Sequence, residues 1–299
     1  ADDTERTVAA AVRTWDCINR ANLLIKVPAT AAGVPAVRTL IGLGVNVNAT
    51  LLFSVTRYRQ IAEAYIAGAE DYAASGQSPA RLASVASFFL SRIDAFVDRR
   101  LDALATGTSR ALRGQAAIAC ARLAYRAYTE MLASPRWQAL APSGGRPQRL
   151  LWASTSTKDP AYSDVKYVEP LIGPDIVITL PLNTLAAYRD HGRPAIRIRD
   201  GLDTAERVIE QLAALGIDVD AAAALRVVLS RFGSVLGAAI LKGLLVLIAM
   251  VFFVVPGVIV WLGLFATPAV VVYERLGATE SIGRSWNLAK GMKGKVLGV

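Results

Sequence analysis

A lysine inside an apolar stretch is the first residue of this sequence with chemical potential. Lys26 interrupts the run NLLIKV at 22–27 and is one of only three lysines in residues 1–241. If this run is a strand, alternation places Lys26 on the face opposite Ile25 and Val27. Burial in a partly dry barrel favours the neutral amine, which can attack a carbonyl and form a Schiff base. A lysine on an edge strand that reaches water is the structural alternative.

Polar residues on the next predicted strand share one face. In VNVNATLLF at 45–53, Asn46, Asn48 and Thr50 alternate with apolar residues. Amides and a hydroxyl on an inner face are unfavourable unless they bind something. They either bind a ligand or cap one another, and both explanations stay open at this point.

Hydroxyl and basic residues follow at the ends of two later strands. Ser87 lies on the predicted strand 82–89, and Arg92 comes one turn beyond its end. A fourth strand ends in ASTSTK, which contains Ser154 and Lys158. A guanidinium at the carboxyl end of a strand suits a phosphate. Together with the lysine, these residues indicate a Schiff-base site for a polyhydroxylated, phosphorylated carbonyl compound.

The elements that must position these residues alternate between strand and helix. We predict strands at 22–27, 45–53, 82–89, 149–154 and 175–180, and helices at 4–19, 30–43, 56–75, 92–104, 112–132 and 203–215. This alternation predicts a parallel sheet with helical crossovers, either an open doubly wound sheet or a barrel. No G-x-G-x-x-G or P-loop motif follows a strand, which argues against nucleotide binding. Polar residues at the carboxyl ends of several strands favour a barrel enzyme.

Composition limits the classes of function. The 299 residues are 54% hydrophobic and 19% charged, which excludes a disordered chain. Two cysteines exclude a disulfide scaffold, and a single histidine, His191, excludes a histidine-ligated metal cluster. We therefore expect no metal site.

The last quarter of the chain differs from the rest. Residues 243–273 contain no charged side chain, and about 20 apolar residues are enough for a helix to cross a bilayer. Pro256 and Pro268 interrupt the run, so one kinked span and two shorter helices are both open. A buried core helix is the alternative. We expect membrane contact through residues 233–273.

The basic excess lies beside this apolar run. Eight of the Lys and Arg residues but only two of the acidic ones lie in residues 225–299, out of a formal net charge of +9 for the chain. The positive-inside rule makes this cluster a cytoplasmic flank. A nucleic-acid patch would need interleaved aromatic residues and fold motifs that are absent, so we expect no nucleic-acid partner.

Two longer stretches are similar to transaldolases, especially those of the longer bacterial type. They read NLLIKVPAT…GVPAVRTLIGLGVNVNATLLFS and RLLWASTSTKDPAYSDVKYVEPLIGPDIVITLP. The resemblance runs from about residue 2 to about residue 224. It implies a (β/α)₈ barrel that moves a dihydroxyacetone unit between sugar phosphates in the cytoplasmic pentose phosphate pathway. The donors are sedoheptulose 7-phosphate or fructose 6-phosphate. No cofactor is implied, because the iminium itself is the electron sink.

The resemblance also assigns roles by matching position. Lys26 falls on the Schiff-base lysine of the family. Asn48 and Thr50 fall on polar site residues, and Ser87 and Arg92 on the serine and arginine that hold the substrate phosphate.

Two further assignments concern the fourth strand. Ser154 matches another site serine, and Ser156 stands where some family members have an arginine. We predict that Lys158 replaces the charge of that arginine.

The matched region begins at the fourth strand of the family's barrel. The acid–base aspartate, the asparagine and the glutamate of the first three strands are therefore unmatched, and Asp3 lies in helix-leading sequence. Five strands do not close a barrel and leave open sheet edges. We expect a partial (β/α)₈ barrel of strands 4–8, with little or no transaldolase activity in this chain as given.

The C-terminal part resembles a different family. The segment FFVVPGVIVWLGLFATPAVVVYERLGATESIGRSWNLAKG is similar to the membrane domain of glycerophosphoryl diester phosphodiesterases, and it adds no catalytic residues. We expect a transaldolase-like domain at 1–224 and a membrane-domain fragment at 225–299. That fragment would hold one or more transmembrane helices and anchor the enzyme to the inner membrane. A fused or misassembled reading frame and a natural anchored enzyme are both open.

Two other functions compete with a transaldolase. One is a non-catalytic integral membrane protein that carries a vestigial barrel module. The other is a Schiff-base aldolase of a different barrel family, which the N-x-T strand and the WASTSTK strand together disfavour. The oligomeric state does not follow from the sequence.

Overall fold

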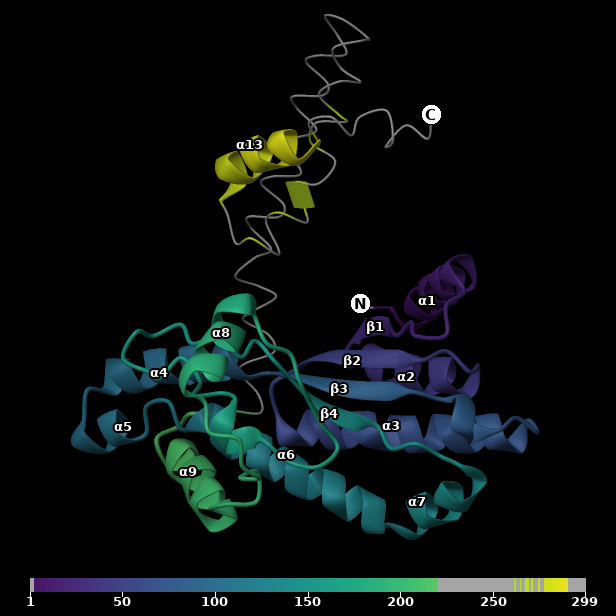
Figure 1. Cartoon of the computed structure of the whole chain (residues 1–299), viewed down its shortest axis with the longest axis horizontal. Helices are drawn as coiled ribbons and strands as arrows, with labels where there is room; N and C mark the ends of the chain where they lie inside the picture. The colour runs from purple at the N-terminus through teal and green to yellow at the C-terminus, as the bar shows by residue number, and fades with distance from the viewer. Residues whose placement is uncertain are drawn as a thin grey trace, which may run out of the picture. The chain divides into compact units, whose positions relative to one another are not determined.

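The computed structural model describes residues 3–219 and 277–289 and the single residues 261, 264, 267, 268, 270 and 274. The chain divides into two compact units, Ala1–Ala224 and Leu225–Val299, which are considered separately. Figure 1 shows the first unit in purple to green.

In the described part of the first unit, five parallel strands form one sheet. In sequence order they are β1 Ile25–Pro28, β2 Val47–Leu52, β3 Ser84–Phe89, β4 Arg149–Ala153 and β5 Ile176–Ile178, and each pairs with the next. An open doubly wound sheet reverses its strand order at a switch point, and the described strands contain no reversal. The predicted α/β fold with a parallel sheet is therefore confirmed, and its strand order is that of successive barrel strands.

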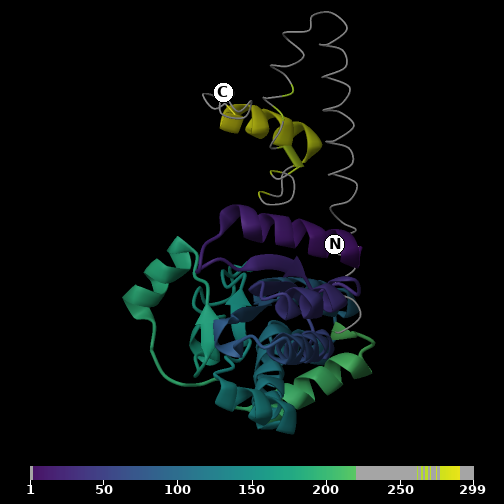
Figure 2. The ribbon, with the colours of Figure 1, turned by 90° about the vertical axis from the view of Figure 1, so that its right-hand side faces the viewer.

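Helices connect the strands, as predicted. Their bounds are α1 Thr4–Ile18, α2 Gly33–Gly42, α3 Val55–Ala74, α4 Leu90–Leu104, α5 Gly107–Ala111, α6 Ala116–Ala133, α7 Pro135–Leu140, α8 Leu182–His191 and α9 Leu202–Ala214, with 3₁₀ turns at Pro79–Arg81, Ala141–Ser143 and Glu169–Leu171. The prediction missed α5, α7 and α8, which are short or have no clear apolar stripe. Figure 2 shows α1 lying over β1.

One face of the sheet packs against the helices through large aromatic side chains. The Phe88 ring meets Tyr58 of α3 and Trp152 of β4 edge-on, with centroid distances of 5.7 and 5.8 Å. All three side chains are buried. Edge-to-face pairs add stabilisation beyond their buried area. This packing fixes which residues of β3 and β4 face the helices.

A buried carboxylate near the start of α4 fastens this helix to its neighbours. Asp94, 1% exposed, accepts hydrogen bonds from the Ala117 N–H of α6 and from the Tyr167 hydroxyl, both at 2.8 Å. The Lys166 ammonium lies 3.8 Å away. Buried charges need such partners, and these bonds join α4 to the start of α6 and to the β4–β5 connection.

A second aspartate repeats the arrangement one turn further along α4. Asp98 accepts from the Gly114 N–H at 2.8 Å and from the Tyr162 hydroxyl at 2.6 Å. Lys166 donates to the Gly114 carbonyl at 2.6 Å and lies 3.8 Å from the centre of the Tyr162 ring. The helix that carries Arg92 is thus held by polar contacts as well as by apolar packing.

In the second unit, α13 (Ala278–Ala289) is the helix that the structure describes, and it buries Ser281 and Ser285. Most of the predicted membrane segment, 243–273, lies outside the described residues, as does much of 233–273. Among the residues that are described, no helix is long and apolar enough to cross a bilayer. The predicted transmembrane helix and inner-membrane anchor therefore gain no support.

The Asp94 contacts predict a pH-dependent stability. Burial raises the pKa of Asp94 from 3.8 to about 6, so between these values the folded protein holds a proton that the unfolded chain has released. Its stabilising contribution is present below pH 4 and is lost as the pH rises through 6. At about 1.4 kcal/mol per pKa unit, we expect the unfolding free energy of wild type, relative to Asp94→Asn, to fall by about 3 kcal/mol. Urea unfolding of both proteins from pH 4 to 8 measures this, and a difference independent of pH would contradict it.

Candidate active site

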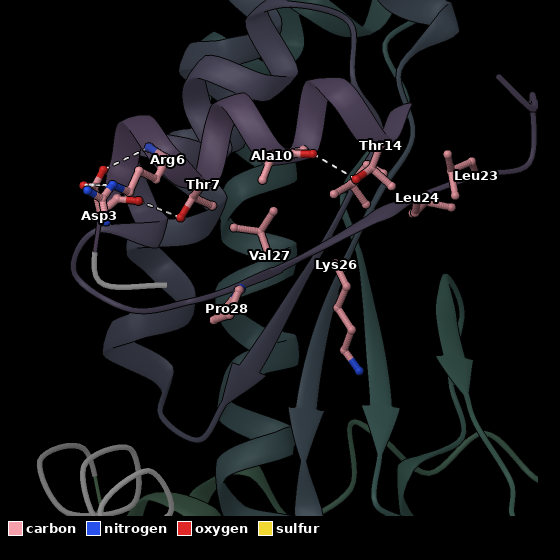
Figure 3. Close-up of a pocket in the computed structure, with 12 residues that line it drawn as sticks. Asp3, Arg6, Thr7, Ala10, Thr14, Leu23, Leu24, Lys26, Val27 and Pro28 are labelled. Carbon is pink, nitrogen blue, oxygen red and sulfur yellow. Dashed lines mark hydrogen bonds and ion pairs between the residues drawn. The ribbon is translucent and has the colours of Figure 1, made fainter. Parts of the chain in front are cut away.

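The carboxyl ends of β1 to β3 bring predicted site residues onto one face of the sheet. Lys26 pairs in register with Asn48. Ile25 and Val27 are buried, and Figure 3 shows Val27 pointing toward α1 while Lys26 points the opposite way. The predicted alternation is confirmed. Lys26 is exposed, however, so the predicted dry surroundings are not found among the described residues.

A hydrogen bond joins two of these residues on neighbouring strands. The Ser87 hydroxyl donates to Asn48 Oδ1 at 2.7 Å, and Ser87 is only 2% exposed. A buried hydroxyl needs such a partner. Because Oδ1 accepts this bond, the Asn48 Nδ2 group remains the donor that a ligand oxygen can use.

The other two polar residues of this part of the chain differ from each other. Asn46 Oδ1 accepts from the Ala83 N–H at 2.7 Å, so Asn46 has a structural partner in the backbone before β3, which is neither Asn48 nor Thr50. Thr50 is 3% exposed, and its buried hydroxyl has no hydrogen-bond partner among the described residues. Thr50 precedes Leu51, whose φ of 62° lies in a register irregularity of β2. Bulges of this kind re-aim side chains beside active sites.

Two cations share one aromatic ring at this end of the sheet. Lys26 Nζ lies 5.7 Å and the Arg92 guanidinium carbon 5.1 Å from the centre of the Phe89 ring. Arg92 is in the first turn of α4, which begins directly after β3. Two cations at one aromatic ring, beside the N-terminus of a helix, form a setting suited to a phosphate. Phe89 was not predicted. The available signal was that Phe89 comes two residues after Ser87 and therefore lies on the same face of β3.

The end of β4 approaches the same helix turn. Ser154 follows β4 with a φ of 57°. Its hydroxyl oxygen lies 2.9 Å from Ser91 Oγ, and its carbonyl accepts the Ser91 N–H at 3.1 Å. Lys158 lies further along this connection, and its Nζ donates to Ser156 Oγ at 3.0 Å.

A groove of about 790 Å³ runs between α1 and β1 and includes Lys26 in its lining (Figure 3). Asp3 is the carboxylate of this lining, and it caps α1 by accepting the Arg6 N–H at 2.9 Å. Figure 3 shows the Lys26 amine pointing away from Asp3. Among the described residues that line the groove, none therefore brings an acid–base group to the amine.

His191 ends α8 and is exposed. Hydrogen bonds to Asp164 at 2.9 Å and to Asp190 at 3.2 Å raise its pKa. Across the part of the chain that the structure describes, no cluster of three His, Cys, Asp or Glu side chains is placed to hold a metal ion.

Parallel strands in sequence order, with a lysine and polar residues at their carboxyl ends, define an α/β domain whose strand order agrees with that of a (β/α) barrel. Residues 1–227 match the family Transaldolase/Fructose-6-phosphate aldolase. The chain belongs to this family.

Curated relatives agree with this assignment. Transaldolases from Saccharopolyspora erythraea and Thiobacillus denitrificans are each 50% identical, over 74% of this chain and over 60% and 62% of their own length. Transaldolase 1 of Streptomyces avermitilis is 52% identical over 64% of this chain and 51% of its own. The chain thus spans about 60% of the first two of these relatives. The family match ends at residue 227, and the predicted membrane-domain resemblance of the C-terminal part gains no support from it.

The hydrogen bond between Asn48 and Ser87 predicts energetic coupling. A typical net hydrogen bond contributes about 1 kcal/mol, so Asn48→Ala and Ser87→Ala should show a coupling energy of that size in a double-mutant cycle. Urea unfolding of wild type, both single variants and the double variant measures it. Strictly additive effects would show that the two side chains do not interact in solution.

Proposed function

We propose that this chain carries the Schiff-base and phosphate-binding part of a transaldolase site, in which Lys26 attacks the carbonyl of a ketose phosphate. One observation supports this above the others. Lys26 and Arg92 lie over the same Phe89 ring, and the hydrogen-bonded Asn48 and Ser87 lie on the same face. An amine nucleophile and an anion-binding cation thus lie within the reach of one small phosphorylated sugar.

The proposed reaction transfers a three-carbon unit. The neutral Lys26 amine adds to the C2 carbonyl of fructose 6-phosphate or sedoheptulose 7-phosphate, and loss of water leaves an iminium. The C4 hydroxyl then loses its proton to a general base, the C3–C4 bond breaks, its electron pair moves into the iminium, and an aldose phosphate leaves as its aldehyde. The remaining dihydroxyacetone enamine attacks the aldehyde of an acceptor aldose phosphate. Water finally cleaves the new iminium, which releases the product ketose phosphate and the free amine.

The other predicted residues have binding roles in this proposal. Arg92 binds the phosphate as a guanidinium, and Lys158 adds positive charge from the β4–β5 connection. Asn48 Nδ2 and the Thr50 hydroxyl bind the hydroxyl groups of the sugar. A ligand oxygen at Thr50 would give its buried hydroxyl the partner it lacks among the described residues. Ser154 donates to the phosphate.

Ser87 acts differently from the role that the resemblance implies. Its proton is already donated to Asn48 Oδ1, so we propose that Ser87 orients the Asn48 amide. We assign the phosphate itself to Arg92, Ser154 and Lys158.

Proton transfer at the C4 hydroxyl needs an acid–base group, and none of the seven proposed residues carries a carboxylate. We therefore expect Schiff-base formation to exceed complete transfer in this chain. The proposed site lies entirely in the first unit, Ala1–Ala224. Identity of about 50% to curated transaldolases favours this function over a non-catalytic module with a vestigial barrel.

Borohydride trapping tests the lysine. With fructose 6-phosphate, reduction of the iminium should leave a stable adduct on the peptide that contains Lys26, detected by peptide mass spectrometry. Lys26→Ala and Lys26→Arg should abolish the adduct, because neither side chain forms an iminium at neutral pH. Labelling at Lys158 or Lys166 that persists in Lys26→Ala would refute the assignment.

Arg92 can be tested by comparing two substrates. Arg92→Ala should raise the concentration of fructose 6-phosphate that half-saturates trapping by about 10- to 100-fold, the usual size of a charged hydrogen bond. Trapping of dihydroxyacetone, which has no phosphate, should change less than about two-fold. An equal effect on both ligands would mean that Arg92 does not bind the phosphate.

A further inference from the structure

A buried serine that the sequence did not single out contacts the proposed phosphate site. Ser91, 1% exposed, precedes Arg92 in the first turn of α4. It contacts Ser154 twice, through its hydroxyl at 2.9 Å and through its N–H at 3.1 Å. These contacts join the first turn of α4 to the end of β4, the two segments that supply Arg92 and Ser154.

The backbone contact has a local cause. The first amides of a helix have no partner within the helix, and the N-cap residue Phe89 offers no side-chain acceptor. The Ser91 N–H instead uses the carbonyl of Ser154, which adopts a φ of 57°. The left-handed region is unfavourable by about 1–2 kcal/mol for a non-glycine residue, and this bond offsets part of that energy.

The hydroxyl contact has a preferred direction. Ser91 is sealed from solvent, whereas Ser154 is partly exposed. If Ser154 donated, the Ser91 proton would need another acceptor inside the protein. If Ser91 donates, its proton is satisfied, and the Ser154 proton remains available to a ligand.

We propose that Ser91 is a positioning residue of the phosphate site: its hydroxyl donates to Ser154, so that the Ser154 proton is directed at a phosphate oxygen beside Arg92. This inference rests on the proposed function. A donor held in place before the ligand arrives loses less entropy on binding, and a chain of hydrogen bonds polarises its last member.

The test compares trapping of a phosphorylated and an unphosphorylated ketone by the full chain. Ser91→Ala keeps the backbone bond and removes the hydroxyl bond. It should raise the half-saturating concentration of fructose 6-phosphate by about five-fold, the effect of one net hydrogen bond. The value for dihydroxyacetone should stay within about two-fold of wild type, because that ligand has no phosphate.

Three further variants separate positioning from general stability. Ser91→Cys nearly preserves the size but donates weakly, so it should repeat the Ser91→Ala result even if the alanine variant folds poorly. Ser91→Thr keeps a hydroxyl and should restore phosphate discrimination. Ser109→Ala is the matched control, because Ser109 is also buried at a helix start and donates to the Thr106 carbonyl. It should lower stability without changing either half-saturation value.

Each outcome has one meaning. Unchanged fructose 6-phosphate trapping in Ser91→Ala and Ser91→Cys would overturn the positioning role and leave the proposed function standing. Equal weakening for both ketones would overturn it too, because that is the result of a purely structural role. No adduct in the wild-type chain would overturn the proposed function, and this inference with it.

Discussion

The alternation of side chains along the parallel strands is the constraint on which the site depends. Phe88 and Trp152 are buried against the helices on one face of the sheet. Ser87 alternates with Phe88 along β3, so Ser87 must face the other way. A shift of one residue in a strand would exchange the two faces. In β1 such a shift would turn Lys26 toward α1 and bring Val27 to the open face. The apolar packing therefore decides the direction of the amine.

The same constraint also sets the position of the Arg92 charge, through helix α4. It begins directly after β3, so the register of β3 sets where Arg92 stands. Asp94 and Asp98 bind the helix to the start of α6 and to the β4–β5 connection, and Ser91 binds its first turn to the end of β4. A raised pKa shows that the burial of Asp94 is unfavourable for its charged form. The helix thus keeps a polar attachment that lowers stability near neutral pH, and in return its orientation is fixed by directional bonds.

Sequence reasoning identified those features that depend on local pattern. The five strands, their parallel connection and the faces of Lys26 and Asn48 follow from period-two alternation and from the helices between strands. The bounds of β1 were shifted, because the predicted strand begins at Asn22, three residues before the paired segment. The prediction that Lys26 has dry surroundings was wrong for the described residues. The exposure of a side chain depends on what covers that face of the sheet and not on the strand itself. The irregularity at Leu51 has no local signal, since it arises from pairing with β3.

The residues that sequence reasoning missed at the site are those whose roles come from their neighbours. Phe89 has no reactive group, and its importance comes from the two cations that the fold places over its ring. Serine is a common residue at a helix start, and only the approach of Ser154 gives the Ser91 hydroxyl its hydrogen-bond partner. The groups that attack or bind a ligand belong to recognisable residue types, whereas the groups that aim them are recognisable only in three dimensions. In the proposed reaction, the amine and the cations are gathered at one end of the sheet, while proton transfer at the sugar needs an acid–base group that none of the seven proposed residues carries.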